Sequence, residues 1–279
     1  GVGSMTVETH DAPSSSPAAP PEATPMLEVT DLVKNFSGVQ AVRGCTFSVA
    51  AGQATGLIGP NGAGKSTVIE VVSGFQSPDA GRVRFAGTEI QGRPPHRISN
   101  AGLVRTFQTP REWANLTTLE NVLLATGNRS NEAAWRAVFA RPSLKAADAE
   151  DRVRARELLD RVGLLRLKNE LAGNLSGGQK RLLEFAKVAF ARPKMVLLDE
   201  PHAGVNPVMG GVLAEAINGL VADGMTVLMV EHNLAFLERV CGPVVVMALG
   251  QVIATGTMAE LRTNSAVIDA YLGEVLPVE

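Results

Sequence analysis

Nine residues between a predicted strand and a predicted helix constrain this chain more than any other feature. They read Gly-Pro-Asn-Gly-Ala-Gly-Lys-Ser-Thr over 59–67 and match the pattern G-x-x-x-x-G-K-[ST]. Residues 53–58 before them favour a buried strand, and residues 68–72 after them can continue a helix. A strand, a glycine-rich loop and a helix in this order are the context in which such a loop binds phosphate. A glycine-rich turn with a chance lysine is disfavoured, because every position of the pattern is filled.

The residue types of this loop suit a nucleoside triphosphate. Glycines permit a tight turn that points several N–H groups inward, and the N-terminus of the helix adds a partial positive charge. Lys65 can reach the β- and γ-phosphates, and the hydroxyl of Ser66 can ligate Mg²⁺. We therefore expect the nucleotide to bind along the whole loop, which consists of Gly59, Pro60, Asn61, Gly62, Ala63, Gly64, Lys65, Ser66 and Thr67.

Composition bounds the size and setting of the protein. A chain of 279 residues suits one domain with a subdomain, or two small domains. The net charge of −2 gives no general attraction to nucleic acid or to an anionic membrane. Cys45 and Cys241 lack metal-ligand spacing and favour buried free thiols over a disulfide. With no apolar run of about 18 residues and no secretory signal, we expect a cytosolic protein, or one held at a membrane by a partner.

The first 25 residues are expected to contribute nothing to a core. Residues 1–4 before Met5 resemble a scar left by tag cleavage. The following residues, through 25, are rich in Pro, Ser and Ala and predict a disordered arm. Alternating apolar residues at 26–29 and 47–49, followed by a turn, predict an antiparallel sheet beside the nucleotide core. Phe36 lies between them and is either a core residue or a platform on which adenine stacks.

Three later segments are predicted strands, and two of them lead into polar residues. Residues 81–85 and 103–107 read as edge strands, and the second ends at Gln108. Gln108 is either a solvated cap or a residue that reaches the metal or the attacking water. The apolar run 195–198 leads into Asp199 and Glu200. Because open parallel sheets hold ligands at the carboxyl ends of their strands, Asp199 is a candidate Mg²⁺ ligand and Glu200 a candidate base for water.

The strand predicted at 226–230 leads into Glu231 and His232, and His232 is either a surface histidine or a group that faces the γ-phosphate. A hairpin is predicted over 244–254, and helices over 259–261 and 265–272 close the chain.

Residues 111–175 lack strand signals and predict a helical insertion. Its helices are expected near 115–122, 132–140 and 146–162, the last with a ragged apolar face that includes Val153. The sequence Leu-Ser-Gly-Gly-Gln at 175–179 then opens a further predicted helix. Its free N–H groups and hydroxyl suit either an anion site or a plain N-cap, and the residues concerned are Ser176, Gly177, Gly178 and Gln179.

Together these motifs resemble the ATP-binding cassette (ABC) family, the nucleotide-hydrolysing subunits of transporters. Five features carry the resemblance in order along the chain: the loop 59–67, Gln108, the pentapeptide 175–179, the strand 195–200 and His232. The pentapeptide Leu-Ser-Gly-Gly-Gln separates this family from other phosphate-loop ATPases such as kinases and small GTPases. The resemblance covers residues 26–273.

The resemblance implies an α/β fold of the P-loop NTPase (RecA-like) type. Its mostly parallel core sheet would carry an antiparallel β subdomain and an α-helical subdomain. Residues 26–274 would form one nucleotide-binding domain, with 26–110 and 176–274 as the catalytic core and 111–175 as the helical subdomain.

The resemblance also implies a composite site for ATP and Mg²⁺. Two cassettes would pack head to tail, so that residues 176–179 of one cover the ATP held by the Lys65 loop of the other. Closure would then depend on the γ-phosphate. Phe36 would stack on adenine, and the metal would lie near Ser66, Gln108 and Asp199. Among the catalytic residues, Glu200 would polarise the attacking water, His232 would contact the γ-phosphate, and Gln108 would sense the metal and link to the helical subdomain.

A narrower resemblance is to the branched-chain amino acid importer cassettes, in particular the larger ATPase of that system. It rests on Arg-Thr-Phe-Gln at 105–108, Asp-Glu-Pro at 199–201, Ala-Gly-Val-Asn-Pro at 203–207, Val-Glu-His-Asn at 230–233 and Ala-Tyr-Leu-Gly-Glu at 270–274. The same motifs occur in cassettes for urea or other amides and for lipopolysaccharide export. The implied partners are a second cassette (a different one or a second copy), two transmembrane permease subunits and, indirectly, an extracytoplasmic solute-binding protein. The implied location is peripheral, on the cytoplasmic face of the cell membrane.

Two further functions are disfavoured. A non-transport cassette ATPase acting on ribosomes or DNA usually has two motif sets and a basic surface, whereas this chain has one set and a net charge of −2. A nucleotide-gated module without turnover would lack Glu200 or His232. His202 departs from the small residue or Thr usual in the subfamily and could affect communication across the dimer. Trp113 and Trp135 are predicted either to be buried or to line a groove for helices of the membrane partners.

Overall fold

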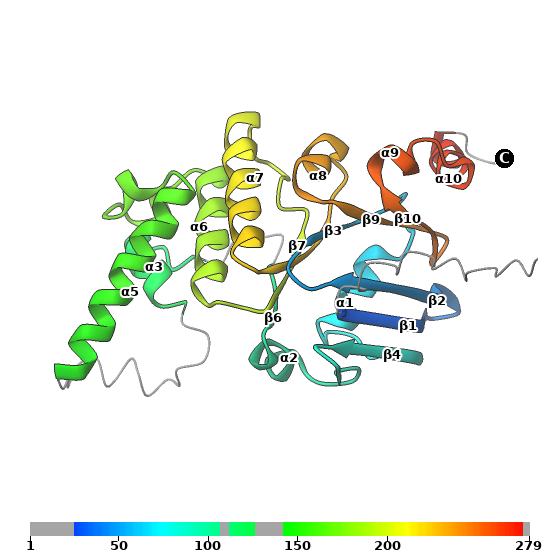
Figure 1. Cartoon of the computed structure of the whole chain (residues 1–279), viewed down its shortest axis with the longest axis horizontal. Coiled ribbons are helices and arrows are strands. Elements are labelled where there is room, and N and C mark those ends of the chain that lie inside the picture. The colour runs from blue at the N-terminus through cyan, green and yellow to red at the C-terminus, as the bar shows by residue number, and fades with distance from the viewer. Residues whose placement is uncertain (1–24, 107–111, 126–141, 276–279) are drawn as a thin grey trace, which may run out of the picture.

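The computed structural model describes residues 25–106, 112–125 and 142–275, and the structural statements that follow concern these residues. Two sheets and their covering helices build the structure (Figure 1). The proposed arm through residue 24 and the helix predicted at 132–140 lie outside the described residues. Pro25, which was assigned to the arm, is the first residue of a strand.

The larger sheet has six strands in the order β10-β9-β3-β8-β7-β6. Neighbours from β9 to β6 run parallel, and β10 pairs antiparallel with β9. Every residue of the three central strands is buried, as expected for parallel strands covered on both faces. The strands are β3 (Ala54–Ile58), β6 (Leu103–Arg105), β7 (Met195–Asp199), β8 (Thr226–Val230), β9 (Pro243–Ala248) and β10 (Gln251–Thr257). The predicted strands 103–107 and 195–198 are confirmed in this sheet, the first only as far as Arg105.

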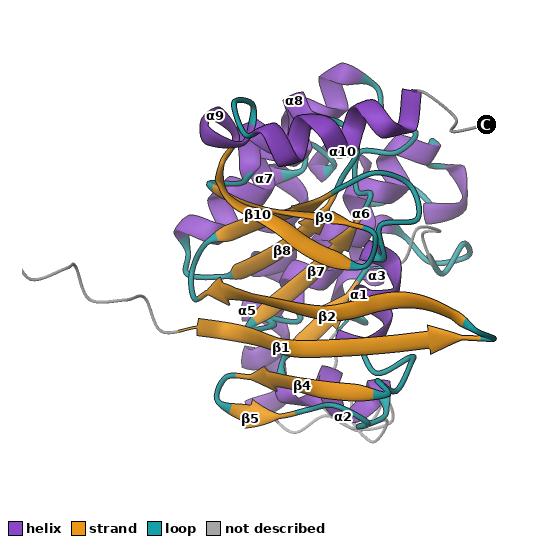
Figure 2. Cartoon of the chain, turned by 90° about the vertical axis from the view of Figure 1, so that its right-hand side faces the viewer, coloured by secondary structure: helices purple, strands orange, loops and turns teal. Residues whose placement is uncertain are grey.

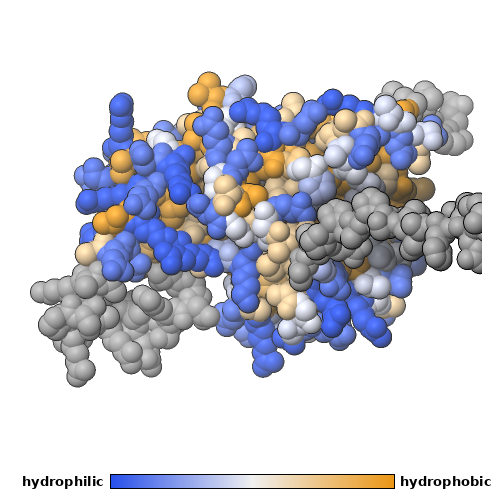
Figure 3. All heavy atoms as spheres, in the orientation of Figure 1, coloured by the Kyte–Doolittle hydropathy of each residue, from blue (hydrophilic) through white to orange (hydrophobic). Residues whose placement is uncertain are grey.

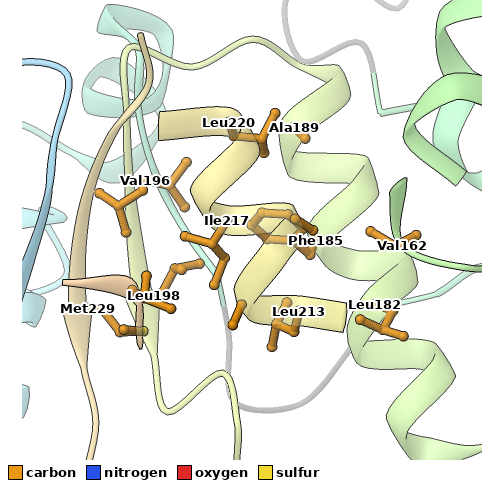
Figure 4. Packing of buried hydrophobic residues seen from close by; sticks show 14 of the residues in the cluster. Val162, Leu182, Phe185, Ala189, Val196, Leu198, Leu213, Ile217, Leu220 and Met229 are labelled. Carbon is orange, nitrogen blue, oxygen red and sulfur yellow. The ribbon is translucent and has the colours of Figure 1, made fainter. Parts of the chain in front are cut away.

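Alternate residues of the central strands supply two separate cores. Val196 and Leu198 of β7 pack under the helices α6 (Gly177–Phe190), α7 (Pro207–Ala222) and α8 (Leu234–Val240). Figure 4 shows these side chains against Phe185 and Ile217 of α6 and α7. The intervening residues of β7 face α1 (Lys65–Val72) and the smaller sheet on the other side. This period of two along a buried strand fixes the register of the sheet relative to its covering layers.

The smaller sheet is antiparallel, as predicted, with the order β2-β1-β4-β5 (Figure 2). Its strands are β1 (Pro25–Phe36), β2 (Val39–Ala50), β4 (Ala80–Phe85) and β5 (Thr88–Glu89). Residues 81–85 were expected at the edge, but the two-residue strand β5 pairs with their outer side. Short edge strands of this kind limit unwanted pairing with other chains. The helix α2 (Pro95–Ala101) connects β5 of this sheet to β6 of the larger sheet.

Helices occupy most of the described residues between β6 and β7 before α6 begins. They are α3 (Thr118–Leu123), α5 (Pro142–Arg161) and two 3₁₀ turns at Leu165–Leu167 and Ala172–Asn174. α5 buries Ala155, Leu158 and Leu159, whereas Val153 is 56% exposed and was wrongly assigned to the apolar face. Hydrophilic residues predominate over the side of the surface where α5 lies (Figure 3). The predicted helix over 146–162 is thereby confirmed, with an apolar face that starts later than expected.

The C-terminal elements follow the prediction closely. β9 and β10 are joined by Leu249 and Gly250, whose φ angles of 48° and 81° are those of a type I′ hairpin turn. Two helices follow, α9 (Met258–Leu261) and α10 (Ser265–Val275). Within the described residues, no helix is both long and apolar enough to cross a membrane.

Both cysteines are buried free thiols, which confirms the prediction. Burial raises the pKa of each thiol to about 12, and the Glu231 carboxylate contributes to the raised pKa of Cys241. At pH 8.5 fewer than about one such thiol in a thousand is ionised, and the thiolate is the reactive form. We expect a disulfide reagent such as DTNB to leave both cysteines unmodified in the native protein at pH 8 and to titrate two thiols in guanidinium. Fast reaction of either thiol in the native protein would contradict this burial.

Candidate functional site

The glycine-rich loop joins β3 to α1, as predicted. Gly59 has a φ of 151°, and a Cβ atom there would clash with the carbonyl oxygen of Met247 on β9. Gly64 has a φ of 97° and caps α1, and a Cβ atom there would approach the carbonyl oxygen of Ala41 to 2.5 Å. These two positions therefore require glycine both for backbone conformation and for space.

Lys65 is buried, and its side chain folds back over the loop. Its Nζ donates hydrogen bonds to the carbonyl oxygens of Gly59 and Pro60, at 2.7 and 2.9 Å. Ser66 is exposed at the start of α1, and so are Asn61 and Gly62. The ammonium group is thus held within a loop whose outer surface is open to a ligand.

Asp199 and Glu200 lie where β7 ends. Asp199 is buried, and its Oδ2 accepts a hydrogen bond from Nη2 of Arg105 at 2.8 Å. Arg105 ends the neighbouring strand β6, and its Nε is buried without a hydrogen-bond partner. In the sequence, Arg105 stands out only as part of Arg-Thr-Phe-Gln, a motif that predicts no role for it. Its place beside Asp199 depends on strand pairing across 94 residues of sequence.

Breaking this buried ion pair is expected to destabilise the fold. In an Arg105→Met variant the Asp199 carboxylate loses its partner while it stays buried, so the free energy of unfolding should fall by about 3 kcal/mol. Arg161→Met is the matched control, because Arg161 and Asp223 are 2.7 Å apart but about half exposed. That change should cost less than about 1 kcal/mol. Equal losses for the two variants in urea titrations would show that the burial of the Arg105 pair has no energetic consequence.

Glu200 and His232 lie at the carboxyl ends of β7 and β8, and the structure brings them together. Nε2 of His232 is 3.1 Å from Oε1 of Glu200. Half of the His232 side chain and about a third of the Glu200 side chain remain exposed. Glu200 adopts a φ of 49°, a left-handed conformation that is uncommon outside glycine. Two solvent-accessible polar groups therefore meet at the carboxyl ends of β7 and β8. The Lys65 loop follows the carboxyl end of the neighbouring parallel strand β3, at the same edge of the sheet.

Gln108 lies outside the described residues, but the chain on both sides of it is anchored. Thr106 donates its N–H to the carbonyl oxygen of Leu197 on β7 at 3.0 Å. Glu112 pairs with Lys180 of α6 at 2.8 Å, and this hydrogen bond lowers the pKa of the Glu112 carboxyl. The described residues on either side of Gln108 therefore contact the end of β7 and the helix α6.

Trp113 is 48% exposed, with the Nζ of Lys187 lying 4.6 Å from the centre of its ring. The expectation that Trp113 is buried is wrong, because the ring rests on the outside of α6. Trp135 lies outside the described residues. Phe36 is likewise 39% exposed at the end of β1, with Lys34 over its ring at 5.3 Å, so it is not a core residue.

Residues 176–179 form a reciprocal N-cap at the start of α6. The Ser176 hydroxyl accepts the N–H of Gln179, and the Gln179 side chain accepts the N–H of Ser176. Within the described residues, no hydrogen bond or ion pair joins this turn to the Lys65 loop. In a single chain the turn thus has the form of a helix cap, and the N–H groups of Gly177 and Gly178 have no partner inside the helix.

His202 follows Pro201 in the turn after β7. Its ring packs on Phe236 of α8, with ring centres 4.8 Å apart, so this departure from the family pattern has a packing partner.

A glycine-rich loop between β3 and α1, with polar residues converging from the ends of neighbouring parallel strands, defines a P-loop nucleotide-binding protein. Residues 42–203 match the family described as ABC transporter, and residues 251–276 match the family described as branched-chain amino acid ATP-binding cassette transporter. The chain belongs to the ABC transporter family and is an ATP hydrolase. This confirms the resemblance and the fold class.

Named relatives match nearly from end to end. The chain is 39% identical to the high-affinity branched-chain amino acid transport ATP-binding protein BraF of Pseudomonas aeruginosa, across 90% of this chain and 98% of that protein. It is 36% identical to the corresponding LivG of Escherichia coli K12, with the same coverage. The crystal structure of the ADP conformation of MJ1267, an ATP-binding cassette of an ABC transporter, superposes with a TM-score of 0.75. That comparison has 34% identity and covers 90% of this chain and all of that one.

Proposed function

We propose that this protein is the ATPase subunit that powers import of branched-chain amino acids. The observation that carries the proposal is its 39% identity, over 98% of the relative, to an ATP-binding protein named for that transport. The C-terminal match over 251–276 to the family of the same name supports it independently. Import of urea or another amide, or export of lipopolysaccharide, is the alternative, because cassettes of those systems share the quoted motifs.

The Lys65 loop binds the triphosphate in this proposal. The Lys65 ammonium exchanges its two loop carbonyl partners for β- and γ-phosphate oxygens, and loop N–H groups surround the phosphates. The exposed ring of Phe36 offers a face for adenine.

The donor set fits Mg²⁺ shared with the nucleotide. The described residues contain no group of three or more His, Cys, Asp or Glu side chains that could hold a metal by themselves. A cation here would take one hydroxyl from Ser66, one carboxylate from Asp199 and the rest from phosphate and water, which is the coordination that Mg²⁺ prefers beside phosphates. When bound, the ion neutralises charge that develops on the phosphates. Gln108 is proposed to contact this ion and to transmit its presence to the helical subdomain.

Hydrolysis is assigned to Glu200 and His232. Glu200 orients a water molecule for attack on the γ-phosphate and accepts its proton. His232, 3.1 Å from Glu200, fixes the direction of that carboxylate and donates a hydrogen bond to the γ-phosphate. Both side chains are accessible enough to meet a substrate.

Assembly completes the site. We assign residues 26–110 and 176–274 to the catalytic core and 111–175 to the helical subdomain. The N–H groups at 176–179 of one cassette would cover ATP on another cassette, which is expected to be a different subunit.

Two permease subunits would dock on the helical subdomain, where the exposed Trp113 supports a contact surface, and a solute-binding protein would act through them. The protein would thus be peripheral on the cytoplasmic face of the membrane.

Transport by the assembled complex tests this function. The tagged chain is purified with its membrane subunits from the native host and placed in proteoliposomes with ATP inside. The solute-binding protein of the system and labelled leucine or urea are then added outside. ATP-dependent leucine uptake that a Lys65→Ala subunit abolishes is the expected result. Uptake of urea without leucine would overturn the amino-acid assignment. Failure of any membrane subunit to co-purify would overturn the proposed role in transport.

A further inference from the structure

Glu231 is a buried carboxylate placed between two loops of the site. It follows the last residue of β8 and is 4% exposed. Its Oε1 accepts the N–H of His202 at 2.8 Å, and its Oε2 accepts the N–H groups of His232 and Asn233 at 3.0 and 3.2 Å. One side chain therefore ties the loop after β7 to the loop after β8.

Those two loops carry Glu200 and His232, and the first of them is strained. The left-handed conformation of Glu200 is unfavourable for a residue with a side chain, and such strain persists only where the surroundings enforce it. The N–H of Glu200 donates to the carbonyl oxygen of Val230 at 2.9 Å, which fixes one side of the turn. The bond from His202 to Glu231 fixes the other side, two residues later.

Glu231 is not explained as an ion-pair partner or a helix cap. Among the residues that the structure describes, no lysine or arginine forms an ion pair with it. The cap of α8 is Asn233, whose side chain accepts the N–H of Phe236. Hydrogen bonds from three N–H groups to a carboxylate are charge-assisted and about twice as strong as neutral ones, so this residue is a strong link between the two loops.

We propose that Glu231 is a positioning residue for ATP hydrolysis, which sets the register of the two loops so that Glu200 and His232 face each other. This inference rests on the roles proposed for that pair. Glu231 contacts neither the Lys65 loop nor the nucleotide in this assignment, so it acts on turnover and not on ATP affinity.

Glu231→Gln is the informative change, because glutamine keeps the shape but has only one oxygen acceptor. Its NH₂ group must then face an N–H group of one loop, which leaves that loop without its anchor. We expect kcat to fall about tenfold, with the Kd for a fluorescent ATP analogue within about twofold of wild type. Glu215→Gln, on the exposed face of α7, is the control and should leave both constants unchanged.

A double-mutant cycle separates positioning from general damage. If Glu231 acts through Glu200, adding Glu231→Gln to a Glu200→Gln protein should change the residual rate less than twofold. A full further tenfold loss, or equal losses of kcat and ATP affinity together with a large drop in Tm, would overturn the proposal, and so would a wild-type kcat. If Glu231→Gln does not fold, Glu231→Asp is measured in the same cycle, because it keeps the charge but cannot span both loops. Wild-type protein without ATPase activity, or Glu200→Gln with full activity, would instead refute the proposed function.

Discussion

Glu200→Gln is expected to slow ATP hydrolysis by roughly 10²- to 10³-fold while leaving ATP binding intact. The amide cannot accept a proton from water, but it keeps the volume of the side chain and a polar contact to His232. If hydrolysis normally reopens a closed pair of cassettes, the variant should accumulate as a closed pair with ATP bound. Light scattering with and without Mg-ATP measures this mass directly, alongside the steady-state rate.

Each result of that experiment has a definite meaning. A mass that doubles only with ATP supports head-to-tail closure and shows that this cassette pairs with itself. A monomer that still binds ATP indicates that the natural partner is a different cassette, to be sought by co-purification. Glu215→Gln should behave as wild type, and a Glu200→Gln protein that hydrolyses ATP at the normal rate would remove Glu200 from the catalytic role.

Lys65→Ala is expected to weaken ATP binding by about 100-fold and to abolish turnover. The change removes a buried cation whose hydrogen bonds to charged phosphate oxygens contribute about 1.5–3 kcal/mol each. Titration with a fluorescent ATP analogue measures the affinity. Lys194→Ala is the control, because Lys194 is exposed beside the amino end of β7, at the opposite edge of the sheet.

A loss of ATP affinity supports the phosphate site only if the Lys65→Ala variant is folded. Lys65 also bonds to Gly59 and Pro60, so thermal unfolding should show only a modest loss of stability. An unchanged affinity in a folded Lys65→Ala protein would contradict the assignment of the loop as the phosphate site.

The sequence predicts the central strands and the glycine loop well for a physical reason. Strands β3, β7 and β8 are buried on both faces, so their apolar runs are continuous, and two glycines of the loop have no permitted substitute. Asp199 and His232 could be placed at one edge of the sheet because the ends of parallel strands meet there.

The contacts that link these strand ends could not be predicted in the same way. Arg105 meets Asp199 across 94 residues, and Glu231 meets His202 across 29, so both contacts depend on which strands are neighbours and in what register. The prediction for Trp113 was wrong because aromatic residues are buried on average, whereas this ring lies on the outside of a helix, beneath the ammonium group of Lys187. Ser176 and Gln179 satisfy each other, which a short pattern alone cannot distinguish from binding an anion.

The reciprocal cap at the start of α6 bears on the rate at which a head-to-tail pair of cassettes would dissociate. Ser176 and Gln179 already have partners within one chain, so a nucleotide on another cassette must either use the remaining N–H groups or displace a cap bond that contributes about 1 kcal/mol. On separation the cap re-forms at once and leaves no unsatisfied hydroxyl or amide behind. In the head-to-tail pair proposed above, the cap would therefore assist dissociation of the two cassettes from within each chain.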